Sequence, residues 1–242
     1  MKRIGLVLLA ALTVVGCSDN KEDEGWRVGY SLGYKFGERV GKEIKDLNLD
    51  AFMAGFQDAY KAGDDEEKKK AVAKLTEEEM QASIKGYQEK RVTQMREELK
   101  QKSEKNANDA KAFLDKNAQN PNVKTLPSGL QYEVIAQGSG PSPKATDIVK
   151  ARYHGTLVDG TVFDSTRERG DTPAEFPLNR VIPAWTEGLQ LMNRGAKYKL
   201  YVPPALGYGE RGAGGKIGPN QALIFEVELV DFNAPDAAPK KR

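Results

Sequence analysis

The chain contains very little cysteine and histidine, with one residue of each among 242. A disulfide framework needs cysteines in pairs, so none can form within the chain. A zinc site of histidine and cysteine is also disfavoured, because two such side chains cannot fill a typical zinc shell. A nucleophile activated by histidine would have to use His154. We therefore expect no metal and no cofactor.

Net charge is scarce as well. Lys and Arg number 37 against 35 Asp and Glu, which gives a formal net charge of +2. This balance excludes a strongly basic nucleic-acid-binding protein and a polyanionic tail protein. Hydrophobic residues make up 39% of the chain, enough for an ordinary core, and the length suits one or two domains.

A long apolar run is missing too. Residues 4–16 are uncharged, but these thirteen residues fall short of the ~20 that span a bilayer. A short apolar run behind Lys2 and Arg3 is typical of a secretory signal, which we place at residues 1–17. The alternative is a buried helix that happens to end in a cysteine.

The end of this run, Val14-Val15-Gly16-Cys17, resembles the bacterial lipobox. The resemblance implies cleavage before Cys17 and attachment of lipid to Cys17. The residue after Cys17 is Ser18. An Asp at this position would direct the protein elsewhere, so Ser18 favours outer-membrane retention in a Gram-negative host. We therefore expect a lipid-anchored protein of the cell envelope, on the periplasmic or the surface face.

After a polar tether at residues 18–25, glycines recur every four residues from Gly25 to Gly41. This spacing predicts one stripe along a helix. Each interior glycine costs roughly 1 kcal/mol relative to alanine, so close approach of another helix is the natural compensation. Charged residues such as Arg27 and Lys35 exclude a membrane span. The alternative is a loop with coincidental glycines.

Two further helices are expected in this region. Asp50 can cap a helix at residues 51–61, and residues 63–67 interrupt the pattern. Thr76 and Glu79 have the capping-box spacing and predict the start of a long helix that reaches about Asn117. Its apolar residues are sparse, so we expect a solvent-exposed helix that bridges two parts of the structure.

The apolar residues of this region are too numerous to be buried in a small unit of three helices, which favours self-association. The segments 30–37, 49–59 and 75–80 resemble the amino-terminal dimerisation domain of FkpA/Mip-like proteins. The resemblance implies a homodimer through residues 26–119, in which the long helix carries each catalytic domain away from the dimer.

The composition changes at Asn120-Pro121. Alternating patterns predict strands at residues 129–135, 148–153, 197–202 and 223–229, with a hairpin turn at Asp159-Gly160 and a short helix at 183–192. These elements indicate an α+β domain over residues 120–233, with an antiparallel sheet wrapped on a helix. A basic tail, residues 234–242, follows it.

Five blocks of this domain, in order, resemble FKBP-type peptidyl-prolyl cis-trans isomerases: residues 152–157, 159–166, 181–189, 203–209 and 223–229. The resemblance implies the FKBP-like fold and isomerase activity (EC 5.2.1.8 class) on X-Pro bonds of unfolded or exported polypeptides. It implies no cofactor.

The resemblance also assigns a site. Trp185 would form the floor of an apolar pocket, Asp164 its acidic group, Tyr208 a hydroxyl donor to a substrate carbonyl, Arg169 the partner of Asp164, and Ile217 a cover. The remaining pocket residues would be Tyr153, Phe163, Val181, Ile182 and Phe225.

Several assignments have plainer alternatives. Asp164 could be a turn residue, and Phe163 and Trp185 could be ordinary core residues. Phe176, Tyr201 and Phe232 are expected in the core. His154 follows Tyr153 on a strand, so its side chain should face away from the pocket.

Two segments depart from the family pattern. Residues 169–174 form a longer insertion than in the smallest members, and Ala174 stands where an aromatic residue is common. Residues 209–219 hold several glycines and no histidine, which favours a mobile flap.

Rotation of a peptide bond crosses a barrier of about 18–20 kcal/mol, because resonance must be broken. An apolar, water-poor pocket favours the twisted amide and needs no nucleophile or metal. A dimeric periplasmic chaperone that holds unfolded chains between its two arms is the alternative function. A lipid-anchored structural protein with an inactive isomerase domain is a third, which the intact set of pocket residues disfavours.

Overall fold

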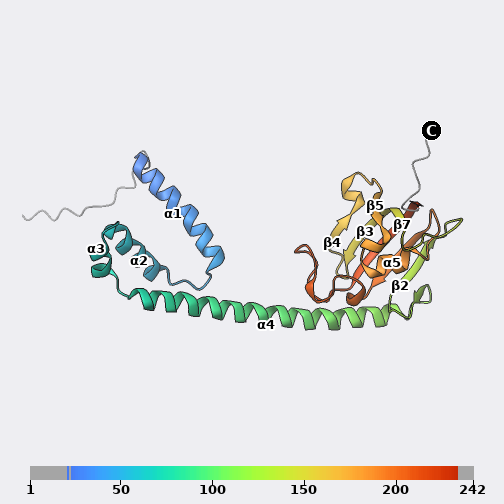
Figure 1. Ribbon diagram of the computed structural model, residues 1–242, viewed down its shortest axis with the longest axis horizontal. Helices are drawn as coiled ribbons and strands as arrows, with labels where there is room; N and C mark the ends of the chain where they lie inside the picture. Colours follow the sequence, from blue (N-terminus) through green and yellow to red (C-terminus); the bar gives the residue numbers. More distant parts are fainter. Residues whose placement is uncertain (1–20, 22, 234–242) are drawn as a thin grey trace, which may run out of the picture. The chain divides into compact units, whose positions relative to one another are not determined.

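A computed structural model describes residue 21 and residues 23–233 of the chain. The expected signal segment with Cys17, and the expected tail 234–242, lie outside the described residues. The chain divides into two units, the first ending at Ile84 and the second beginning at Lys85 (Figure 1). None of the helices in the described ranges is both long and apolar enough to cross a membrane.

The glycine-spaced segment of the first unit is the helix α1 (Glu24–Glu43), which confirms the helix and makes the loop alternative wrong. The helix begins inside the range expected for the tether, because the Asp23 carboxylate accepts a hydrogen bond from the Trp26 backbone N–H at 2.7 Å. A Cβ added at any glycine from Gly29 to Gly41 would meet no described atom within 4 Å. The stripe is therefore not covered by other parts of the first unit.

Two shorter helices follow, α2 (Leu49–Ala62) and α3 (Glu66–Val72). The cap of α2 is Asn48 rather than the expected Asp50, since the Asn48 side chain accepts from the Ala51 N–H at 2.9 Å. The helix α3 lies where the sequence suggested only an interruption. Asp65 initiates it by accepting from the backbone N–H groups of Glu67 and Lys68.

The long helix α4 (Glu77–Asn117) begins at the predicted capping box. The Thr76 N–H donates to the Glu79 carboxylate at 2.8 Å, and the Glu79 N–H donates to the Thr76 hydroxyl at 3.2 Å. These reciprocal bonds satisfy backbone donors that the first helical turn leaves without partners.

Apolar side chains of the first unit remain largely exposed. Ala62 is the one buried residue in the described part of this unit, and Leu32 is 67% exposed. Exposed large hydrophobic residues occur on all four helical segments: Val28, Tyr30, Leu32, Tyr34, Phe36, Leu49, Met53, Phe56, Tyr60, Val72, Met80 and Ile84. The unit therefore has almost no core of its own.

The second unit is built on one antiparallel sheet in the order β1-β2-β6-β7-β3-β4, with β5 also paired to β3. The strands are β1 (Val123–Thr125), β2 (Gln131–Ala136), β3 (Ile148–Leu157), β4 (Val162–Ser165), β5 (Ala174–Pro177), β6 (Lys197–Val202) and β7 (Leu223–Asn233). The four predicted strands are confirmed, and three short strands were not predicted.

The short helix α5 (Pro183–Leu189) covers one face of this sheet, as Figure 1 shows. It approaches closely at Gly188, where an added Cβ would lie 3.0 Å from a Leu200 methyl group. On β3 alternate residues are buried, so one face of the strand meets the core and the other carries polar side chains. This arrangement confirms the predicted antiparallel sheet wrapped on a helix.

The last turns of α4 belong to the second unit and pack against its sheet, so the prediction of a solvent-exposed helix is wrong for this part. Ala110 is buried, and the Phe113 ring lies 6.1 Å from the Tyr201 ring. The Gln131 amide donates to the Leu114 carbonyl at 2.9 Å and accepts from the Asn117 amide at 2.8 Å. Apart from Phe113, small and polar residues of α4 make this contact, and a search for apolar periodicity does not detect them.

Candidate active site

Aromatic rings surround Trp185, which is 3% exposed at the start of α5. The rings of Tyr153, Phe176 and Phe225 lie 5.2–5.5 Å from its ring and meet it edge to face. Phe163 extends the group by packing on Phe225 at 5.3 Å. We call these five residues the aromatic cluster. Edge-to-face pairs of this kind add to the stability gained from burial alone.

The close packing of the aromatic cluster depends on Gly155 in β3. A Cβ added there would lie 2.7 Å from two atoms of the Phe163 ring and 3.1 Å from the Phe225 ring. The absence of a side chain therefore lets both rings lie across the strand. The hairpin predicted at Asp159-Gly160 joins β3 to β4 and places Asp164 opposite Gly155 in the sheet.

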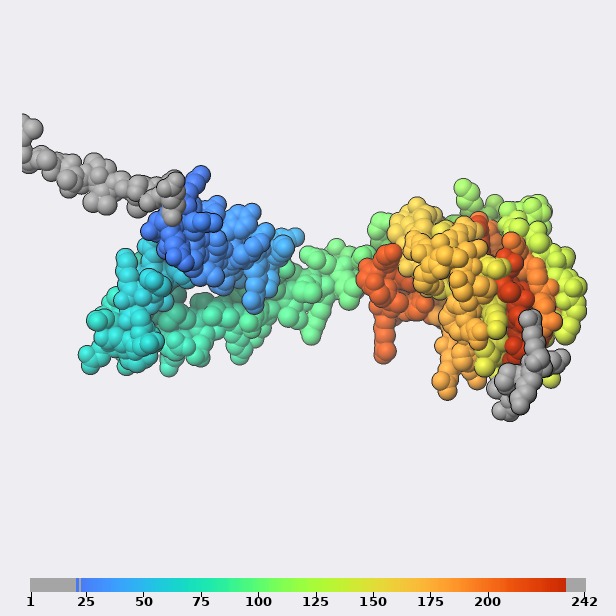
Figure 2. Space-filling model, turned by 90° about the horizontal axis from the view of Figure 1, so that it is seen from above, coloured from blue at the N-terminus to red at the C-terminus, as the bar shows by residue number. Residues whose placement is uncertain are grey.

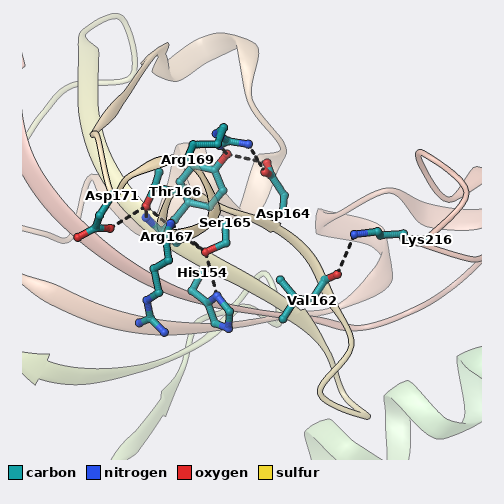
Figure 3. Close-up of polar contacts among 10 residues, drawn as sticks. His154, Val162, Asp164, Ser165, Thr166, Arg167, Arg169, Asp171 and Lys216 are labelled. Atoms are coloured by element: carbon teal, nitrogen blue, oxygen red, sulfur yellow. Dashed lines mark hydrogen bonds and ion pairs between the residues drawn. The ribbon is translucent and has the colours of Figure 1, made fainter.

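Polar groups lie beside the cluster and are bonded to one another (Figure 3). The Tyr153 hydroxyl donates to one Asp164 oxygen at 2.6 Å, and the Arg169 guanidinium donates to the other at 2.7 Å. Arg169 also donates to the Tyr153 hydroxyl at 2.8 Å. We call these three residues the polar triad.

The helical turn η1 (Thr166–Arg169) brings Arg169 back over Asp164. The Ser165 hydroxyl caps this turn by accepting from the Arg167 N–H at 3.2 Å. The Thr166 hydroxyl accepts from the Tyr153 N–H at 3.1 Å, which ties the turn to β3. The expected pairing of Arg169 with Asp164 is thus present.

These contacts shift the pKa values in opposite directions. Burial alone would raise the pKa of Asp164, but hydrogen bonds from Tyr153 and Arg169 outweigh it and hold that pKa below its ordinary value. Burial, aided by the bond to Asp164, raises the pKa of Tyr153. At neutral pH Asp164 is therefore ionised, while Tyr153 is a neutral donor.

Tyr208 offers a second hydroxyl near this group. Burial raises the pKa of Tyr208, and the negative charge of Asp164 adds to the effect. Its side chain is 39% exposed, and within the part of the chain that the structure describes its hydroxyl has no hydrogen-bond partner. This donor is available to a ligand.

The other expected residues fall around the same cluster. Val181 and Ile182 are half-buried just before α5, where the Ile182 carbonyl accepts from the Trp185 N–H at 2.9 Å. Ile217 is buried and packs with Trp185 and Phe225 in one hydrophobic core. The structure thus brings together all ten site residues expected for the isomerase domain, while Cys17 lies outside the described residues.

Phe176 belongs to the aromatic cluster, although the sequence suggested only a core role. It lies on β5, two residues after Ala174. Ala174 is the position at which the family commonly has an aromatic residue. Ala174 and Phe176 share one face of β5, but this strand of four residues was not predicted from the sequence. Tyr201 and Phe232 lie away from the cluster, one against Phe113 and the other beneath the Arg194 guanidinium.

His154 faces the opposite side of β3 from the aromatic cluster, as expected. Its Nδ1 atom lies 3.0 Å from the Ser165 hydroxyl, which is itself buried (Figure 3). A hollow of about 480 Å³ lies on this outer face of the sheet, lined by charged residues that include Arg152, Arg167 and Glu226. Its charges are largely paired, so it offers little to an apolar substrate.

No group of His, Cys, Asp or Glu in the described ranges could hold a metal ion. The site therefore offers an apolar surface formed by the aromatic cluster, a fixed carboxylate and a free hydroxyl donor. Such a set can bind an apolar ring with an adjacent carbonyl group, but it contains no activated nucleophile.

Comparison with known proteins gives two family matches. Residues 140–230 match "FKBP-type peptidyl-prolyl cis-trans isomerase", and residues 26–134 match "Domain amino terminal to FKBP-type peptidyl-prolyl isomerase". The chain is 39% identical to "Peptidyl-prolyl cis-trans isomerase Mip" of Coxiella burnetii, over 95% of this chain and 98% of that protein. It is 38% identical to "Outer membrane protein MIP" of Legionella longbeachae, over 94% and 93%.

Among solved structures, the chain is similar to the crystal structure of FkpA from Escherichia coli. The TM-score is 0.73 at 33% sequence identity, covering 88% of this chain and 98% of that one. The likeness spans the helical part as well as the sheet, in agreement with the expected fold.

Proposed function

The chain belongs to the FKBP-type peptidyl-prolyl cis-trans isomerase family, and from this premise we propose that it accelerates X-Pro rotation in exported polypeptides at the aromatic cluster. The observation that carries the proposal is the joint placement of this cluster and the polar triad. An apolar floor of edge-to-face rings and a fixed charge lie at one end of α5.

The chemistry follows from amide resonance. A planar amide has more charge separation between oxygen and nitrogen than a twisted amide has, and water solvates the planar form better. Transfer of the X-Pro bond onto aromatic rings removes this solvation, so the twisted form gains relative to the planar form. A lowering of the activation free energy by about 1.4 kcal/mol raises the rate tenfold.

Each polar residue has a distinct role in this proposal. The Tyr208 hydroxyl donates to the substrate carbonyl, because it is exposed and available. Asp164 holds Tyr153 and Arg169 in place, since both of its oxygens already accept hydrogen bonds. Val181, Ile182 and Ile217 add apolar contacts around the proline ring.

Substitutions of Trp185 and Asp164 test the site. Trp185→Ala and Asp164→Ala should each lower kcat/KM on a short X-Pro peptide at least tenfold, as followed by NMR exchange. Asp115→Asn removes an exposed carboxylate on α4 and should leave the rate unchanged. Unchanged rates in both site variants would overturn the assignment.

We also propose a homodimer through residues 26–119, and the exposed surface of the first unit supports it. Its apolar side chains are exposed and its glycine stripe is open, so a second copy of the chain could cover both. A sedimentation measurement on the full chain distinguishes a dimer from a monomer.

The localisation proposed for the protein depends on the expected signal segment at residues 1–17. A related protein is named an outer membrane protein, and the motif before Cys17 suits lipid attachment. We propose a lipid anchor at Cys17 in the outer membrane of a Gram-negative cell. The mass of the mature amino terminus tests it: a free Ser18 or an uncleaved Met1 would contradict the anchor.

A chaperone activity is the second candidate, favoured by an exposed apolar stripe on α4. Val92, Met95 and Leu99 share one helical face and are each about half exposed. Such a stripe could hold unfolded segments without acting on proline. Suppression of aggregation of a proline-free client, retained in Trp185→Ala, would support it.

A further inference from the structure

The loop between β6 and β7 carries Ile217 and lies directly against α4. In Figure 2 the orange-red surface of this loop adjoins the green surface of the helix. The Asn106 side-chain amide donates to the Pro219 carbonyl at 2.7 Å. The Asn220 side-chain amide donates to the Ser103 hydroxyl at 2.9 Å. Ser103 and Asn106 are three residues apart and therefore share one face of the helix.

The contact is close as well as polar. A Cβ added at Gly218 would lie 3.3 Å from the Asn106 amide nitrogen and 3.3 Å from a Lys102 carbon. The loop backbone at Gly218 therefore lies directly against the Lys102 and Asn106 side chains of the helix. Pro219 is buried at this contact.

The loop itself is held together internally, despite the glycines that suggested a flap. Ala213 and Ile217 exchange two backbone hydrogen bonds at 2.9 and 3.0 Å. The Asn220 N–H donates to the Gly209 carbonyl at 2.8 Å, and the Gly218 N–H donates to the Gln221 side chain at 2.6 Å. Gly212 has φ +63°, and a Cβ there would collide with the Ile217 carbonyl. Glycine thus allows a tight turn.

Because the loop is a small body of its own, contacts with other elements set its position. Lys216 reaches β4, where its ammonium group donates to the Val162 carbonyl at 3.2 Å, beside Phe163 (Figure 3). At the opposite end Ser103 and Asn106 hold Pro219 and Asn220. Ile217 lies between these two attachments and packs on the aromatic cluster.

We infer that Ser103 and Asn106 of α4 are positioning residues for the isomerase site, because they hold the loop at the place where Ile217 can cover a bound substrate. This inference rests on the proposed function, in which Ile217 contacts the substrate. The end of the long helix then serves the enzyme as well as linking the chain, in keeping with a second unit that begins at Lys85.

The test uses the full chain with Ser103→Ala and Asn106→Ala, each compared with Asn108→Ala. Asn108 lies on the same helix and is exposed. Its substitution changes helix propensity as Asn106→Ala does, but it removes no contact with the loop. Ser103→Thr keeps a hydroxyl acceptor and should restore the behaviour of the parent protein.

We expect KM for an X-Pro peptide to rise roughly two- to tenfold in Ser103→Ala and Asn106→Ala, with kcat changed less than about twofold. The reason is that the loop covers the substrate while the rings remain in place. Hydrogen exchange at the Ile217 amide should also accelerate, because Ile217 is buried against the aromatic cluster and becomes accessible to water when the loop lifts from it. Asn108→Ala should change neither quantity.

Equal KM values and equal Ile217 exchange in all three alanine variants would overturn the inference. A loss of both kcat and thermal stability with an unchanged KM would also overturn it. That pattern indicates that the contact only stabilises the fold. If the parent protein is inactive on the X-Pro peptide, or if Trp185→Ala is as active as the parent protein, the proposed function fails. Exchange at Ile217 still reports whether α4 positions the loop.

Discussion

A single methyl group added at Gly155 should disrupt the packing of the Phe163 and Phe225 rings. An alanine Cβ would lie 2.7 Å from the Cε2 and Cζ atoms of Phe163 and 3.1 Å from Phe225. Favourable carbon–carbon contacts lie near 3.5–4.0 Å, so the Phe163 ring would have to move by about 1 Å or the hairpin would have to open. Overpacking of this kind costs about 1–3 kcal/mol.

We therefore expect Gly155→Ala to lower the free energy of unfolding by about 1–3 kcal/mol and to reduce kcat/KM on a short X-Pro peptide several-fold. Thermal unfolding and NMR exchange measure the two effects. The matched control is Gly86→Ala on α4, where the added Cβ meets no described atom within 4 Å. Because glycine weakens a helix, that variant should be as stable as the parent protein or more so. Unchanged stability and activity in Gly155→Ala would refute the packing argument.

Three further results are expected. Tyr153→Phe removes a donor to Asp164, so stability should fall by about 1–2 kcal/mol and the pKa of Asp164 should rise; an unshifted carboxyl titration by NMR would contradict this. Because the pKa of Asp164 lies below its ordinary value of 3.8, its stabilising effect is complete above that pH and is lost as pH falls through the lower folded value. Acid unfolding of Asp164→Asn should therefore show a weaker pH dependence below 3.8 than the parent protein, and identical curves would exclude the effect. A chain that begins at residue 85 lacks α1, α2 and α3 with their exposed apolar side chains and should sediment as a monomer; a dimer would show that these three helices are not needed for the interface.

Local signals made much of the fold predictable. The capping box at Thr76 and Glu79, the glycine spacing of α1 and the alternation of the four main strands each depend on neighbouring residues. The site residues, in contrast, were expected from the resemblance of the ordered blocks around Asp164 and Trp185 to a known family, and not from local signals.

Contacts between distant residues escaped prediction. The bond from Asn106 to Pro219 joins positions 113 apart and uses a residue type that is common on exposed helices. Phe176 lies on a strand of four residues, too short to give a clear alternating pattern. The helix α3 depends on a single capping side chain, Asp65, in a stretch that otherwise resembles a loop. Tertiary packing decided the first two cases, and a local cap decided the third.

The two tryptophans offer the most direct test of where the substrate binds. Trp185 lies at the centre of the aromatic cluster, whereas Trp26 lies on α1 in the first unit. In an NMR titration with a short X-Pro peptide, the indole N–H signal of Trp185 should shift progressively and that of Trp26 should remain in place. An unshifted Trp185 signal, together with shifts at Arg167 and Lys199 beside the charged hollow, would contradict the central claim.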